Sequence, residues 1–172
     1  MKKLYFIRHG QSVFNVQGKL AGSTNTPLTD EGRAQAKATG QMMRANDIKV
    51  DFIAASPLSR AHETAKIVAK EIGYDPEKIH TNQLLIERHY GELEGKPWAP
   101  DLNLDGFSDI ETDDTLIERA HLALKWLKTI DADTILIVSH GGFGRAIRSL
   151  TLSDFPMHRY VRISNAELIE LI

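Results

Sequence analysis

The sequence TILIVSHGGFGRAIRSL, residues 134–150, contains the clearest strand signal in the chain. Residues 134–138 are a short apolar run rich in β-branched side chains, which is typical of a fully buried strand. Polar residues follow at Ser139 and His140, and residues 142–152 then show helical spacing. This order, strand, polar turn and helix, is the repeating unit of a parallel α/β sheet.

The same alternation continues on both sides of this stretch. Further strands are predicted at residues 4–7, 52–55, 79–86 and 167–172, and a further helix at residues 117–127. Thr29 is a good N-cap for another helix, because Asp30 and Glu31 in its first turn complement the helix dipole. We expect the buried stripe of this helix to consist of Ala34, Ala38, Met42 and Ala45.

One more helix is predicted after the strand at residues 52–55. Ser56 and Pro57 are expected to be its N-cap and first residue, and Gly73 its end. Its buried stripe is expected to consist of Ala61, Ala65, Val68 and Ile72. We therefore predict a three-layer α/β/α sandwich with a mostly parallel central sheet of about six strands and helices on both faces. Residues 1–172 are expected to form one domain with a small irregular cap at about 96–114.

Composition excludes several classes of protein. The 172 residues carry 21 basic and 23 acidic side chains and no cysteine. A net charge of −2 gives no electrostatic signature of a nucleic-acid or membrane partner, and the lack of cysteine excludes disulfides, thiolate zinc sites and thiol catalysis. No apolar run is long enough for a signal peptide or a membrane span, so we expect a cytoplasmic protein.

Chemically active side chains follow four of the predicted strands. Arg8 and His9 come directly after the first strand, and His140 follows the run at 134–138. Arg60 lies in the first turn after the second strand, and Glu87 follows the third. Because ligands bind at the carboxyl ends of strands in open α/β sheets, we expect these five side chains to meet.

Two guanidinium groups, two imidazoles and a carboxylate suit phosphoryl transfer. Guanidinium groups bind phosphate oxygens with two hydrogen bonds, and helix N-termini add amide donors. A neutral histidine attacks phosphorus as a nucleophile, and a carboxyl group protonates the leaving oxygen and then activates water. This chemistry needs no metal and no cofactor.

The motifs resemble those of the histidine phosphatase superfamily, which contains the phosphoglycerate mutase-like enzymes. The matching blocks are RHGQS at residues 8–12 with Asn15, Gly22 with PLT at 27–29 and Gly32, SPL at 56–58 with Arg60 and Ala61 and with Thr64 and Ala65, Glu87 with Gly91, Glu94 and Gly95, and SHGG at 139–142. These ordered blocks cover nearly the whole chain.

The resemblance implies a role for each matching residue. It makes His9 the nucleophile and Glu87 the proton donor, with Arg8, Arg60 and His140 holding the phosphoryl oxygens. Asn15 and the backbone around Gly22 and Gly141 are expected to assist. Glu92 and Glu94 are alternatives to Glu87, which we favour because it keeps the family spacing before Gly91.

Within this family the sequence leaves phosphatase and mutase open. ERHYG at residues 87–91 resembles the mutase motif and implies Arg88 and Tyr90 near a carboxylated substrate. Against a mutase, residues 97–117 hold six acids and no base, Gly142 stands where mutases have asparagine, and we expect their longer C-terminal tail to be absent. We therefore favour a metal-independent phosphatase, with a non-catalytic phosphate-binding module as a further alternative.

The acidic segment also suggests a leaving group. Its acids are Asp101, Asp105, Asp109, Glu111, Asp113 and Asp114, and Trp98 and Phe107 are apolar anchors among them. We interpret this composition as a preference for an aromatic, sugar-like or cationic leaving group. The expected partner is a small phosphorylated metabolite, and the expected assembly is a monomer or homodimer. Asn165 is expected to be a turn residue outside the site.

Overall fold

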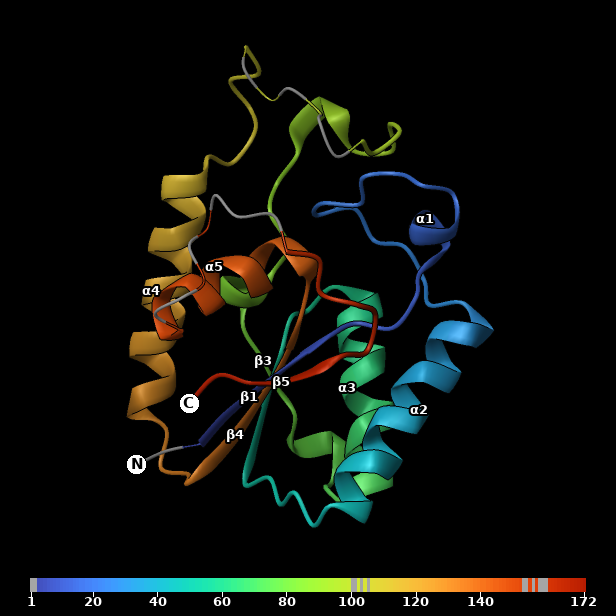
Figure 1. The fold of residues 1–172 in the computed structure, drawn as a ribbon, viewed down its shortest axis with the longest axis vertical. Coiled ribbons are helices and arrows are strands. Elements are labelled where there is room, and N and C mark those ends of the chain that lie inside the picture. Colours follow the sequence, from blue (N-terminus) through green and yellow to red (C-terminus); the bar gives the residue numbers. More distant parts are fainter. Residues whose placement is uncertain are drawn as a thin grey trace.

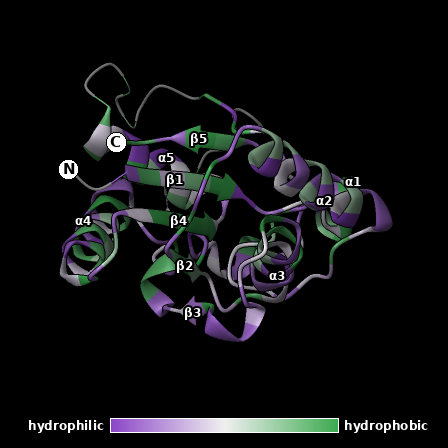
Figure 2. Ribbon diagram, turned by 90° about the horizontal axis from the view of Figure 1, so that it is seen from below, coloured by the Kyte–Doolittle hydropathy of each residue, from purple (hydrophilic) through white to green (hydrophobic). Residues whose placement is uncertain are grey.

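A computed structural model describes residues 3–99, 102, 104, 106–152, 155, 157 and 161–172. Its central sheet has the strand order β3-β2-β4-β1-β5 (Figure 2). The strands are β1 (Lys3–Arg8), β2 (Phe52–Ala55), β3 (His80–Thr81), β4 (Thr134–Ser139) and β5 (Leu168–Glu170). All pairings are parallel except that of β1 with β5. The mostly parallel sheet is thus confirmed, with five strands in the described part of the chain where about six were expected.

Two helices cover each face of the sheet (Figures 1 and 2). On one face are α2 (Asp30–Ala45) and α3 (Ser59–Ile72), and on the other α4 (Asp113–Thr129) and α5 (Gly141–Thr151). Alternate side chains of β1 and β4 point to opposite faces, so Phe6 and Ile137 belong to one core cluster and Ile7 and Val138 to the other. The predicted three-layer sandwich is confirmed.

The predicted cap of α2 is confirmed, but its predicted stripe is wrong. The Thr29 side chain accepts a hydrogen bond from the Gly32 amide. The buried residues are Gly32, Ala36, Gly40 and Met43, whereas Ala34, Ala38, Met42 and Ala45 are exposed. Glycine forms half of the true stripe because a β-carbon at Gly40 would lie 2.6 Å from the Glu71 Cβ of α3. Counting only apolar side chains therefore selected the wrong helix face.

Two other predicted boundaries are also corrected. The third strand has two residues, because the Asn82 side chain accepts a hydrogen bond from the Leu84 amide and begins a 3₁₀ helix at Gln83–Leu85. Helix α3 begins at Ser59 with Leu58 as N-cap, so Ser56 and Pro57 precede it. The Ser56 hydroxyl instead accepts from the Leu58 amide and bonds to His140.

The described segments between β1 and α2 and between β2 and α4 contain short elements besides α3. After β1 comes α1 (Val13–Val16), and between β3 and α4 lies the 3₁₀ helix Gly91–Leu93; the 3₁₀ turn Pro76–Lys78 precedes β3. The described residues between 96 and 112 form no helix or strand longer than an isolated bridge, as expected of the irregular cap. Figure 1 shows this segment and α1 above the sheet. No helix in the described ranges is long and apolar enough to span a membrane.

Candidate active site

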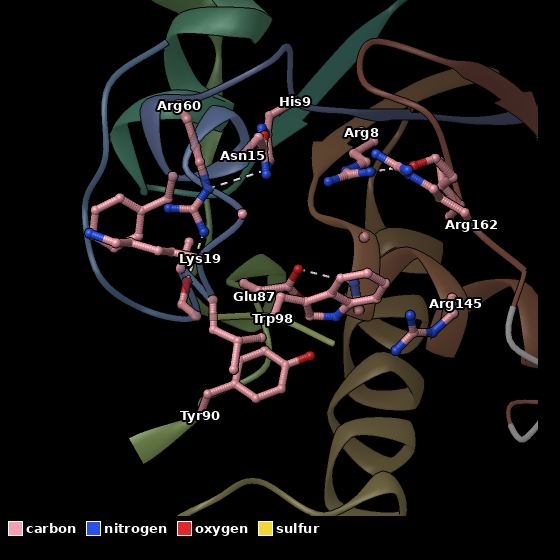
Figure 3. Close-up of a pocket in the computed structure, with 18 residues that line it drawn as sticks. Arg8, His9, Asn15, Lys19, Arg60, Glu87, Tyr90, Trp98, Arg145 and Arg162 are labelled. Atoms are coloured by element: carbon pink, nitrogen blue, oxygen red, sulfur yellow. Dashed lines mark hydrogen bonds between the residues drawn. The ribbon is translucent and has the colours of Figure 1, made fainter. Parts of the chain in front are cut away.

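A cavity of about 280 Å³ opens at the carboxyl ends of β1 and β4 (Figure 3). It brings together eight of the nine predicted site residues: Arg8, His9, Asn15, Gly22, Arg60, Glu87, Tyr90 and Gly141. The ninth, His140, is fully buried and lies against His9, with 5.2 Å between the ring centroids. Arg8, His9, Arg60, Glu87 and His140 thus lie together at one edge of the sheet, and their roles stay predictions.

The His9 ring is held through hydrogen bonds at both of its nitrogens. Its Nδ1 lies 2.7 Å from the Gly10 carbonyl oxygen, which requires Nδ1 to carry the hydrogen and makes Nε2 the acceptor nitrogen. The Arg60 Nε donates to that Nε2 at 3.2 Å. Burial, followed by the charges of Arg60 and Arg8, lowers the pKa of His9 well below its usual 6.5. The imidazole is therefore neutral at physiological pH.

His140 has a similar electrostatic environment. Burial, followed by the charge of Arg60, lowers its pKa well below the usual value, so this ring is also neutral. Its Nε2 lies 2.8 Å from the Ser56 hydroxyl, and its buried Nδ1 has no hydrogen-bond partner among the described residues. A buried ring nitrogen without a partner is costly unless a ligand supplies one.

Arg60 is fixed by the loop that contains Gly22 and Thr24. Its two terminal nitrogens donate to the Gly22 and Thr24 carbonyls, both at 2.8 Å. Burial lowers its pKa to about 10, which still leaves the group charged at neutral pH. The Arg60 side chain is fully buried. The Arg60 backbone carbonyl accepts a hydrogen bond from the Thr64 hydroxyl, and that hydroxyl accepts one from the Gly10 amide.

Glu94 holds this loop from the opposite side. Its carboxylate accepts hydrogen bonds from the amides of Ser23, Thr24 and Tyr90 and from the hydroxyls of Ser23 and Thr24. Burial opposes its ionisation, but these hydrogen bonds outweigh burial and hold its pKa below the usual value. Gly22 has a φ of +50°, and a β-carbon there would lie 2.1 Å from Glu94 Oε1. The loop therefore requires glycine at this position.

Glu87 is the carboxylate that lines the cavity. It accepts hydrogen bonds from the Arg88 amide and from the Gly142 and Phe143 amides at the N-terminus of α5, at 2.7–3.1 Å. Of the two alternatives, Glu94 is committed to the Gly22 loop, and Glu92 is exposed and does not line the cavity. The geometry thus favours Glu87 over both.

Arg8 and Asn15 are tied to the segment before β5. Arg8 donates to the Ile163 carbonyl. Asn165 lies in a turn, as expected, but its side chain also donates to the His9 carbonyl at 3.0 Å and to Asn15 Oδ1 at 3.2 Å. Its contribution to the site was missed, because nothing in the sequence near residue 165 indicates a contact with a loop 150 residues away.

Arg88 does not face the cavity as the mutase-like motif implied. It is buried and donates to the Glu111 carbonyl and to Asp113 at the start of α4. Tyr90 does line the cavity. Burial and the charge of Glu87 raise the pKa of Tyr90 to about 12, so its phenol remains protonated.

Three cations that the sequence interpretation missed also line the cavity: Lys19, Arg145 and Arg162. Arg145 lies four residues after Gly141 and hence on the same face of α5, a signal that was available. The sequence leaves open whether the acidic segment covers the site, and its described acids do not line the cavity. Asp109 accepts a hydrogen bond from the Glu92 amide, and Glu111 and Asp113 bind Arg119 and Arg88. Asp101 and Asp105 lie outside the described residues.

No group of three or more histidine, aspartate or glutamate side chains in the described ranges is placed to hold a metal ion. The site can instead present fixed guanidinium groups and a neutral imidazole to an oxyanion. Guanidinium groups and a neutral imidazole are the groups that stabilise and form the transition state of phosphoryl transfer.

The chain resembles known proteins in sequence and in fold. The family model described as histidine phosphatase superfamily (branch 1) matches residues 4–172. A 2,3-bisphosphoglycerate-dependent phosphoglycerate mutase of Gloeobacter violaceus is 38% identical over 95 residues, which are 55% of this chain and 42% of that protein. The match thus spans less than half of the mutase's length.

Solved structures share the fold over nearly the whole chain. A phosphoglycerate mutase of Bacillus anthracis superposes with a TM-score of 0.85 at 19% identity, covering 98% of this chain and 86% of that one, and shows the fold alone. A phosphoserine phosphatase of Entamoeba histolytica in complex with phosphoserine gives a TM-score of 0.79 at 26% identity, covering 98% and 89%. Phosphatases and mutases thus both occur among the relatives.

Proposed function

The chain belongs to the histidine phosphatase superfamily, and from this membership we propose that it is a phosphatase that hydrolyses a small-molecule phosphomonoester through a phosphohistidine on His9. One observation carries the proposal: His9 is buried and neutral, with Nδ1 bonded to the Gly10 carbonyl and Nε2 beside Arg60. An imidazole held in this tautomer and next to a phosphate-binding cation is prepared for nucleophilic attack.

In the first step, the His9 Nε2 lone pair gives up its hydrogen bond from the Arg60 Nε and attacks phosphorus, while the bond from phosphorus to the ester oxygen breaks. Arg8 and Arg60 bind the equatorial oxygens, where the transition state concentrates negative charge. The buried Nδ1 of His140, which has no hydrogen-bond partner in the described part of the chain, is the further donor in this proposal. Protonated Glu87 transfers its proton to the departing oxygen, so the product leaves as an alcohol.

In the second step, a water molecule attacks the phosphohistidine. The Glu87 carboxylate takes a proton from that water as its oxygen bonds to phosphorus. The bond between phosphorus and Nε2 breaks, inorganic phosphate is released, and His9 returns to its neutral state. Glu87 therefore alternates between acid and base on one face of the cavity.

Direct trapping of the intermediate tests the proposal. Rapid acid-free quenching with a labelled phosphomonoester is expected to place label on His9, and the His9→Ala variant is expected to lose both the label and nearly all kcat. His62→Ala, a histidine of α3 that does not line the cavity, is the control. Activity is expected to persist in excess EDTA. Phosphate binding without turnover between pH 5 and 8 would instead indicate the non-catalytic module.

A mutase remains the second candidate, because the curated relatives at 38% identity are mutases and the described acids do not line the cavity. Incubation with 3-phosphoglycerate, with and without 2,3-bisphosphoglycerate, separates the two activities. We expect phosphate release that does not depend on the bisphosphate. Bisphosphate-dependent formation of 2-phosphoglycerate would establish the mutase.

A cytoplasmic location and a monomeric or homodimeric state are part of our proposal.

A further inference from the structure

The chain around Glu87 has no sheet ladder to hold it. Strand β3 ends at Thr81, the 3₁₀ helix Gln83–Leu85 follows, and residues 86–90 form no helix or strand. The Glu87 carboxylate nevertheless lies against the Gly142 and Phe143 amides of α5. Backbone carbonyls outside a ladder need other donors, so the position of Glu87 depends on the groups that supply them.

One side chain, Arg119 of α4, supplies most of these donors. Its Nη1 donates to the carbonyls of Leu84 and Ile86 at 2.9 and 2.8 Å. Its Nη2 donates to the Glu87 carbonyl at 3.4 Å. A single guanidinium group thus replaces the strand neighbour that this segment lacks.

Glu111 fixes the Arg119 guanidinium group from the other side. Its two carboxylate oxygens accept from Nε at 2.8 Å and from Nη2 at 2.7 Å, which makes a bidentate pair. Glu111 also accepts from the His89 amide at 3.2 Å, and its own amide donates to the His89 carbonyl. Burial raises the pKa of Glu111, but the hydrogen bonds and charge of Arg119 outweigh burial and lower it. The ionised pair therefore holds the chain on both sides of Glu87.

Arg119 also supports the amide that receives the Glu87 carboxylate. Its guanidinium carbon lies 5.5 Å from the centroid of the Phe143 ring, and the Phe143 amide donates to Glu87 Oε1 at 3.1 Å. A lysine ammonium group is a point charge with three donors and does not reproduce this fork of contacts. Arg119 is not among the residues that line the cavity. It therefore acts through Glu87 and not on the substrate.

We propose that Arg119, oriented by Glu111, is a positioning residue that holds Glu87 where it exchanges protons with the leaving oxygen and with water. This inference rests on the proposed role of Glu87 as acid and base. A proton donor must lie within hydrogen-bond distance of the leaving oxygen, and a displacement of about 1 Å costs up to about 10²-fold in rate. Glu111, one acid of the segment 97–117, thereby serves the acid Glu87 and does not contact the leaving group.

Leaving-group dependence tests the positioning role. In Arg119→Lys, which keeps the charge beside Glu111, we expect kcat to fall about tenfold or more for an alkyl phosphate and under about threefold for p-nitrophenyl phosphate. KM should change by less than about threefold, because Arg119 does not touch the substrate. In a Glu87→Gln background, Arg119→Lys should affect both esters equally, since the group that it positions is gone. Arg33→Gln, which removes a 2.6 Å ion pair with Glu63, is the control and should leave the kcat ratio of the two esters unchanged.

Amide hydrogen exchange measures the position of Glu87 without turnover. Gly142 lies in the first turn of α5, where amides have no partner within the helix, and its amide donates to Glu87 Oε2 at 3.0 Å. We expect this amide to exchange about tenfold faster in Arg119→Lys, measured by NMR, and at the wild-type rate in Arg33→Gln. Glu87→Ala gives the rate of the unprotected amide.

The two measurements separate this inference from the proposed function. An unchanged exchange rate of the Gly142 amide in folded Arg119→Lys would overturn the inference, as would equal kcat losses for two esters that Glu87→Gln distinguishes. If Glu87→Gln does not distinguish the esters, the proposed acid is wrong, and the exchange rate alone decides whether Arg119 positions this carboxylate. Should Arg119→Lys not fold, Glu111→Gln keeps the arginine, weakens its orientation and is judged by the same two readouts.

Discussion

At the scale of single residues, the site depends on how Glu87 is held. Its carboxylate accepts hydrogen bonds from two amides at the N-terminus of α5, where the helix dipole favours a negative charge. The same residue is proposed to give a proton to the leaving oxygen. The contribution of Glu87 should therefore depend on how much the leaving oxygen needs that proton.

Glu87→Gln tests this dependence. We expect kcat for an alkyl phosphate to fall by about 10²-fold or more, because an alkoxide leaves poorly without a proton. The loss for p-nitrophenyl phosphate is expected to be under about tenfold, since p-nitrophenolate is a stable anion. Steady-state kinetics on both esters measures the difference, with Glu92→Gln as the control. Equal losses for the two esters would contradict the assignment of Glu87 as the acid.

Gly142 sets the position of Glu87. A β-carbon at residue 142 would lie 2.5 Å from Glu87 Oε1, whereas one at Gly141 would lie 3.5 Å from its nearest neighbour, an atom of Arg8. We expect Gly142→Ala to displace the carboxylate and to lower kcat for alkyl phosphates several-fold more than Gly141→Ala does. Steady-state kinetics of the two alanine variants measures this difference in kcat. An equal loss of kcat in both variants would show that the Glu87 side chain moves aside freely.

The sequence was most informative where residues lie in motifs. Five site residues lie just after a strand or in the first turn of a helix, and the topology of a parallel sheet brings such positions together. They are Arg8, His9, Arg60, Glu87 and His140. Arg145 and Asn165 were missed because neither adjoins a strand end in a recognised block. Arg88 was misplaced because the motif that contains it gives no information on its partner, Asp113, 25 residues away.

At the scale of elements, the errors share a physical cause. Hydrophobic periodicity predicted β1, β2 and β4 well, because buried parallel strands are apolar along their whole length. It failed at β3, where the Asn82 side chain bonds to the backbone and ends the strand. It also failed in α2, where close packing at Gly40 determines the buried face. Neither effect changes the pattern of apolar residues.

The loop that binds Arg60 is itself an element held by one side chain, Glu94. We expect Glu94→Gln to lower the free energy of unfolding by about 1–3 kcal/mol at pH 7, because hydrogen bonds to a charged acceptor are lost or weakened. The activity of the variant should fall as well, since the carbonyls that hold Arg60 belong to this loop. Urea unfolding and kcat measure both effects, with Glu92→Gln as the control.

The pH dependence of this effect has a definite sign. The pKa of Glu94 is lower in the folded protein than its usual value of about 4.5, so its stabilisation is fully present above that value and is lost as pH falls through the folded pKa. The stability difference between wild type and Glu94→Gln should therefore shrink from pH 7 to pH 4. A difference that stays constant would show that the charge of Glu94 contributes nothing.

At the scale of the whole molecule, the net charge of −2 is an average over separate regions. Four arginines and one lysine line the cavity, while Glu111 before α4 and Asp113 at its start form ion pairs with Arg119 and Arg88. The near-neutral total therefore concealed a cavity whose charged lining is mostly cationic. Summed charge predicts partners poorly when opposite charges are sorted into different surfaces.

Folding of the whole molecule also buries two imidazoles beside cations. The pKa values of His9 and His140 lie well below 6.5 in the folded protein, whereas both residues titrate near 6.5 once the chain unfolds. Below pH 6.5 the unfolded state therefore binds more protons than the folded state, and stability falls as pH decreases. Each imidazole should therefore lower the free energy of unfolding as the pH falls from 7.5 to 5.

Urea unfolding across this range tests the prediction. The buffers must lack phosphate, because an anion bound in the cavity would stabilise the folded state. We expect the stability of wild type to fall across this range and that of His140→Asn to fall clearly less, since one imidazole remains. His121→Gln, at an exposed position of α4, should retain the full loss. A flat profile in wild type, or an unchanged slope in His140→Asn, would show that the two rings do not stay neutral on folding, and would remove the basis for His9 as a nucleophile in mildly acidic solution.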